Sequence, residues 1–151
     1  MALLRTPLHD LCREGGGRMV PFAGWEMPVQ FSGLIQEHKA VRERMGMFDI
    51  SHMGVLRLEG PKPKDALQQL VPTDLHRIGP GEACYTVLLN DRGGIRDDLI
   101  VYDRGALDAD RGSLVLVINA ACTDNDTAWI RERMEPAGLR VTDSKADGDP
   151  Q

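Results

Sequence analysis

Two adjacent acids, Asp97 and Asp98, have the clearest capacity for chemistry in this sequence. They lie in the segment GGIRDDLIVY at 93–102, which has the composition of a strand. Side chains alternate between the two faces of a strand, so Asp98 should share a face with Tyr102, and Asp97 with Leu99. The two carboxylates then point apart and do not form a dyad with each other. Either both acids belong to a solvated hairpin turn, or one faces a pocket and acts on an amine or iminium group.

Two further residues could contact a ligand. Asn119 ends the apolar run LVLVINA at 114–120. Its amide offers a donor and an acceptor to the edge of a heterocycle, although a strand-end Asn more often bonds to nearby backbone. Met53, next to Gly54, is either a core residue or an adaptable contact to a flat ligand. Both alternatives stay open for each residue at this point.

Histidines and cysteines give no pattern of a metal site or a disulfide framework. The four histidines are scattered without ligand spacing, and the three cysteines, Cys12, Cys84 and Cys122, lack a CxxC pair. We therefore expect no metal, and reduced thiols in a cytoplasmic protein. Small apolar positions in a strand or at a helix start are the expected places for these cysteines. Nucleotide-binding and serine-hydrolase motifs are also missing from the sequence.

Composition narrows the class of protein. The 151 residues predict one domain, and 42% hydrophobic with 27% charged residues is an ordinary soluble composition. The formal net charge of −5 argues against a nucleic-acid partner. No apolar run reaches the roughly 18 residues of a membrane span, and the first residues do not resemble a signal peptide, so we expect no membrane association.

The elements that would position these side chains are short helices and strands. Asp91–Gly94 should join strands at 83–90 and 95–103 in an antiparallel hairpin. Pro21, Gly24 and Pro28 punctuate an apolar stretch that predicts an irregular strand or a buried loop. The remaining strands are expected at 48–58, 114–120 and 139–143. Helices are expected near 6–14 (capped by Thr6), 34–45, 61–70 and 123–138. Because this order lacks strict strand–helix alternation, it predicts the α+β class.

Three segments together resemble the T-protein of the glycine cleavage system. They are PFAGWEMPVQF at 21–31, GMFDISHMG at 46–54 and GGIRDDLIVY at 93–102. The last two are shared with sarcosine and dimethylglycine dehydrogenase relatives, whereas the first is more particular to the aminomethyltransferase. The resemblance extends, in the same order, over nearly all of residues 6–143.

The resemblance implies a tetrahydrofolate-dependent aminomethyltransferase. Such a protein takes an aminomethyl group from the lipoyl arm of the H-protein, releases ammonia and forms methylenetetrahydrofolate. The family's catalytic aspartate matches Asp98, and positions that contact folate match Met53, Tyr85, Tyr102 and Asn119. Arg57 departs from the pattern, because an apolar residue is usual there.

Family members are more than twice as long as this chain. We therefore expect residues 1–143 to form the N-terminal portion of the folate-binding domain, an incomplete α+β fold with a mixed, mainly antiparallel sheet and flanking helices. Residues 144–151 should form a disordered tail. A truncated or frame-shifted chain, inactive alone, is the expectation. The alternatives are an inactive folate-binding fragment, a non-enzymatic folate-binding relative, and a domain fragment of a sarcosine- or dimethylglycine-oxidising enzyme.

Overall fold

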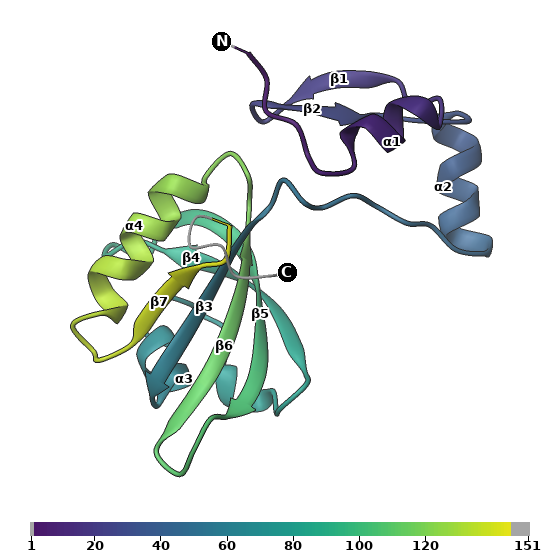
Figure 1. The fold of residues 1–151 in the computed structure, drawn as a ribbon. Coiled ribbons are helices and arrows are strands. Elements are labelled where there is room, and N and C mark those ends of the chain that lie inside the picture. The colour runs from purple at the N-terminus through teal and green to yellow at the C-terminus, as the bar shows by residue number, and fades with distance from the viewer. Residues whose placement is uncertain (1, 146–151) are drawn as a thin grey trace. The chain divides into compact units, whose positions relative to one another are not determined.

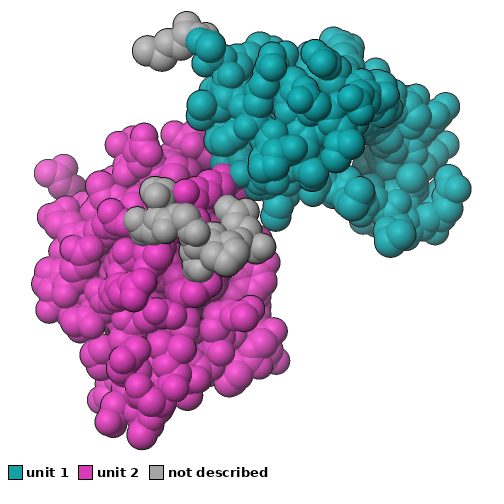
Figure 2. Space-filling model, in the orientation of Figure 1, with its two compact units in different colours: residues 1–52 teal, residues 53–151 magenta. Residues whose placement is uncertain are grey.

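The computed structural model describes residues 2–145, and the chain divides into two compact units. They span residues 1–52 and 53–151 (Figure 2). Length alone predicted a single domain. The structure differs because every residue of the main hydrophobic core lies between Leu56 and Val141, so that the first unit contributes nothing to it.

The first unit combines a two-stranded hairpin with two helices. Its elements are α1 (His9–Glu14), β1 (Met19–Phe22), β2 (Trp25–Pro28) and α2 (Leu34–Glu43) (Figure 1). The strands pair antiparallel, where the sequence predicted an irregular strand or loop. Ala23 and Gly24 make the tight turn, with φ angles of 49° and 82°. Because this turn reverses the chain, the segment with Pro21 and Pro28 forms a regular hairpin.

The first helix begins later than the capping pattern predicted. We expected Thr6 to cap it, but α1 begins at His9 and no side chain caps it. The Thr6 hydroxyl instead lies 2.6 Å from Asp49 Oδ2, to which it donates a hydrogen bond. A bond to a distant carboxylate in the same unit has therefore replaced the local cap.

The second unit is a five-stranded antiparallel sheet with short helices. The strand order is β4-β5-β6-β3-β7. Its elements are β3 (Gly54–Pro61), α3 (Pro63–Leu67), a 3₁₀ turn (Leu75–Arg77), β4 (Ala83–Leu89), β5 (Ile95–Ala106), β6 (Arg111–Ile118), α4 (Thr123–Met134) and β7 (Arg140–Asp143). The predicted central hairpin, the strand after it and the helix from Thr123 are confirmed, and so is the α+β class.

The two faces of this sheet differ. One, which we call the core face, carries fully buried side chains such as Leu56, Val101 and Leu116, and α3 and α4 add Leu67 and Ile130 to the same cluster. Val55, Ile100, Val115 and Val117 on the other face are only half-buried, and Tyr85 and Tyr102 are exposed. We call this second face the tyrosine face.

The last described residues continue along β3. Ser144 is buried, and its backbone N–H donates to the Val55 carbonyl oxygen at 3.0 Å. Residues 146–151, which make up most of the tail expected to be disordered, lie outside the described residues. Within the described range, no helix is long and apolar enough to cross a membrane.

Candidate functional site

Four of the residues singled out from the sequence lie at one end of the sheet of the second unit. In an antiparallel sheet, the start of one strand lies beside the end of its neighbour. Ile118 pairs with both Gly54 and Leu99. This register brings Met53, which precedes β3, to the same sheet end as Asn119, which follows β6, and as Asp97 and Asp98 near the start of β5.

The two adjacent acids lie on opposite faces, as strand alternation predicted. Asp97 pairs with Leu88, whose side chain is fully buried, and so belongs to the core face. Asp98 pairs with Val87 and belongs to the tyrosine face. Asp98 is half-buried, so its carboxylate is partly accessible to a ligand on that face.

The Asn119 amide joins the two acids. Its Nδ2 lies 3.0 Å from Asp97 Oδ1 and 3.2 Å from both Asp98 Oδ1 and the Asp98 backbone oxygen. These bonds fix the amide nitrogen toward β5 and do not use the amide carbonyl oxygen. Asn119 thus fills the structural role considered from the sequence, while one polar atom is left for a ligand.

The two tyrosines share the face of Asp98 but differ in their distance from it. A hydrogen bond to Asp98, together with burial and nearby negative charge, raises the pKa of Tyr85. Tyr102 lies four residues along the strand from Asp98, roughly 13 Å away at the rise of a β-strand. Arg57 lies in the same row as Tyr102, since both pair with Val115 of β6. The structure therefore joins Asp98, Asn119 and Tyr85, and places Tyr102 and Arg57 farther along the same face.

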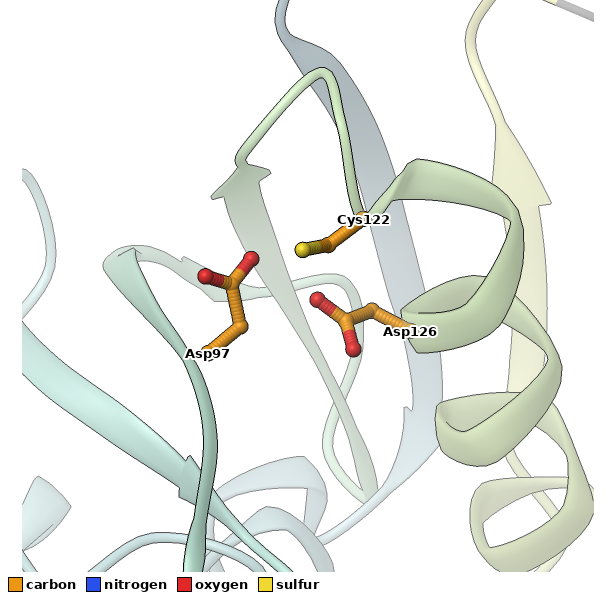
Figure 3. Close-up of side chains that lie close together, drawn as sticks. All are labelled: Asp97, Cys122 and Asp126. Atoms are coloured by element: carbon orange, nitrogen blue, oxygen red, sulfur yellow. The ribbon is translucent and has the colours of Figure 1, made fainter. Parts of the chain in front are cut away.

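A second group of polar side chains, on the core face, was missed from the sequence. Asp97, Cys122 and Asp126 point toward one another, and their carboxylate oxygens and sulfur lie within 4.8 Å (Figure 3). The sequence offered a solvated turn as one place for Asp97, but the structure puts its carboxylate beside Asp126 of helix α4. The only sequence signal for this group was Asp126 in the first turn of a helix. That signal is unspecific, because the helix dipole favours exposed acids at the same position.

Burial and charge set the protonation of this group. Burial, the hydrogen bond to Asp97 and the charge of Asp97 raise the pKa of Asp126 to about 7. Burial also acts on Asp97, but hydrogen bonds with Asn119 and Asp126 outweigh it and lower the pKa of Asp97. Burial and both carboxylates raise the pKa of the Cys122 thiol. Because metals bind the thiolate and deprotonated carboxylates, a metal ion would have to displace the protons of Cys122 and Asp126 to bind here.

Comparisons with known proteins all point to one family. The family described as the GCVT N-terminal domain matches residues 8–148. The aminomethyltransferase of Parasynechococcus marenigrum (strain WH8102) is 84% identical over 148 residues, which are 98% of this chain and 40% of that protein. The aminomethyltransferase of Synechococcus sp. (strain CC9902) is 84% identical over 146 residues, again 40% of its length.

A solved structure agrees with these matches. The glycine cleavage system aminomethyltransferase T from Bartonella henselae has a TM-score of 0.81 and 36% sequence identity to this chain. The match covers 93% of this chain and 38% of the Bartonella chain. The chain thus spans about 40% of the length of the curated relatives that it matches.

Proposed function

Because this chain belongs to the GCVT N-terminal domain family, we propose that it is the part of a glycine-cleavage aminomethyltransferase that contributes the catalytic carboxylate and much of the tetrahydrofolate site. The observation that supports this most is the placement of Asp98. Its carboxylate lies on the tyrosine face, accepts a hydrogen bond from Asn119 Nδ2 at 3.2 Å, and interacts with Tyr85. A carboxylate held by two neighbours is already oriented before a substrate arrives.

The proposed reaction needs a fixed negative charge. The lipoyl arm of the H-protein presents an aminomethyl group, and breaking the bond between its carbon and sulfur leaves the thiol on the lipoyl arm and generates a cationic iminium carbon. Asp98 stabilises that cation electrostatically. As a folate nitrogen attacks the carbon, the same carboxylate accepts the proton that the nitrogen releases. A second folate nitrogen then displaces ammonia from the same carbon, so the products are ammonia, methylenetetrahydrofolate and the H-protein with its lipoyl arm as the dithiol.

The tyrosine face suits a flat, partly apolar ligand. Tyr85 is 65% exposed and Tyr102 is 38% exposed, so both rings offer surface for stacking. Met53 supplies an adaptable apolar side chain at the sheet end. The side-chain carbonyl oxygen of Asn119, which the bonds to Asp97 and Asp98 do not use, can accept a hydrogen bond from the edge of the heterocycle. Arg57 introduces a cation on this face, and there we expect the folate contact to differ from the family pattern.

A chimera tests this proposal. The 148 residues of this chain that match the Parasynechococcus marenigrum aminomethyltransferase replace the corresponding segment of that protein, which supplies the remaining part of the enzyme. We expect the chimera to form methylenetetrahydrofolate from aminomethyl-lipoyl H-protein and tetrahydrofolate. The 151-residue chain alone should show little or no turnover.

Variants of the chimera assign the residue. Asp98→Asn should lower turnover by about 10²–10⁴-fold, the usual contribution of a positioned acid or base, with a smaller effect on folate binding. Asp108→Asn, at an exposed acid of the same unit, is the matched control and should leave turnover unchanged. Near-normal turnover of Asp98→Asn would refute the assignment. A folded chimera that binds folate without any turnover would instead support a non-enzymatic folate-binding relative.

A further inference from the structure

The buried acid Asp126 lies behind the proposed site, on the core face. It belongs to the first turn of α4 and is 2% exposed. Asp97 approaches it from β5. Cys122, the residue directly before α4, approaches it from the start of the helix (Figure 3). Asp97 Oδ2 and Asp126 Oδ2 are both buried and have no hydrogen-bond partner within the described part of the chain. Each of these oxygens therefore needs a donor that the ionised pair cannot supply.

A single proton resolves this arrangement. Two carboxylates so close together in a buried place repel each other when both are ionised, so one of them keeps its proton until the pH reaches neutrality. The groups that act electrostatically on Asp126 are the negative Asp97 and the positive Arg96, both from β5, and the repulsion by Asp97 together with burial outweighs the attraction by Arg96. Asp126 is the more buried acid and Asp97 already accepts a bond from Asn119, so the proton resides on Asp126.

The pair is connected to the catalytic acid. Asp97 accepts a hydrogen bond from Asn119 Nδ2, and the same nitrogen donates to Asp98. A change in the charge or position of Asp97 therefore acts on the amide that holds the Asp98 carboxylate. Such a chain of hydrogen bonds orients a reacting group without touching the substrate.

We propose that Asp126 is a positioning residue: as a neutral acid it donates a hydrogen bond to the Asp97 carboxylate, and this pair fixes, through Asn119, the orientation of Asp98. The catalytic consequence rests on the proposed aminomethyl transfer, whereas the shared proton and its link to Asn119 do not. The two parts therefore have separate tests.

Nuclear magnetic resonance of the 151-residue chain tests the shared proton. We expect the Asp126 carboxyl carbon to titrate near neutral pH and the Asn119 side-chain amide signals to move with the same midpoint. Asp126→Asn, whose amide can still donate to Asp97, should abolish this movement. Asp124→Asn, an exposed acid of the same helix, should leave it intact. An Asp126 that titrates near pH 4, or Asn119 signals unchanged through the titration of Asp126, would overturn the proposal without reliance on any variant.

Kinetics of the chimera test the consequence for catalysis. Asp126→Leu removes the donor and should lower kcat about 10- to 100-fold with a smaller change in the KM for tetrahydrofolate, as expected for a misplaced reacting group. Asp126→Asn should restore most of that loss and remove the step near neutral pH from the pH–rate profile. Equal kcat for Asp126→Leu and the unchanged chimera would refute positioning. A chimera without any turnover would refute the proposed function while the resonance data still decided the shared proton.

Discussion

Replacing Asp126 by Asn should change how the stability of this chain depends on pH. In the folded chain the pKa of Asp126 is raised from 3.8 to about 7. Below pH 4 the Asp126 carboxyl is neutral in both the folded and the unfolded state, so its raised pKa does not change the free energy of unfolding there. Between pH 4 and 7 the unfolded chain has lost the proton that the folded chain keeps, so raising the pH favours unfolding.

The size of the effect follows from the shift. One pKa unit corresponds to about 1.4 kcal/mol, so the free energy of unfolding should fall by about 4 kcal/mol between pH 4 and 7 and then level off. That is a large share of the roughly 5–15 kcal/mol that stabilises a typical domain. Asp97 acts in the opposite sense and in another window. Its lowered pKa contributes stability above pH 4 that is lost as the medium becomes more acidic.

Urea unfolding measured at several pH values between 4.5 and 8 checks this prediction. Asp126→Asn should flatten the profile in that range and make the chain more stable than the original at pH 8, because a neutral donor replaces an ionised, buried acid. The control is Asp124→Asn, which removes a negative charge at an exposed position of the same helix. It should reproduce the original slope. Equal slopes for the original chain and Asp126→Asn would show that Asp126 is ionised over the whole range.

Three substitutions should destabilise the second unit, each measured as the free energy of unfolding in urea. Leu56→Ala should cost about 2–5 kcal/mol, because the Leu56 side chain is fully buried in the core. Gly54→Ala should cost about 1–3 kcal/mol, since a Cβ there would lie 2.6 Å from Ile118 Cγ1, and an unchanged midpoint would mean that β3 and β6 can separate freely. Lys64→Met should cost about 3–5 kcal/mol because it strands the buried Asp103, 2.6 Å from Lys64 Nζ, and Asp103→Leu added to it should recover part of the loss.

Local patterns determined the part of the fold that carries the proposed catalytic acid. The residues of GGIRDDLIVY alternate between faces, and this period of two assigned Asp97 and Asp98 to opposite sides. Asp91–Gly94 supplied the hairpin turn, and the pattern of LVLVINA followed by a polar helix start placed Asn119 at a strand end. These predictions succeeded because the relevant interactions join residues close in the sequence. The family resemblance rests in the same way on short segments that are contiguous in the chain.

Contacts between distant elements were decided only by the tertiary structure. Thr6 follows the pattern of a helix cap, yet it bonds to Asp49, because a buried hydroxyl takes the best acceptor that packing brings near. Asp126 has the sequence signature of an ordinary acid in a first helical turn. Its neutral state depends on burial and on Asp97, and both arise only when α4 packs on the core face of the sheet. Sequence spacing cannot reveal this, since the pKa of a carboxyl is a property of its surroundings in space.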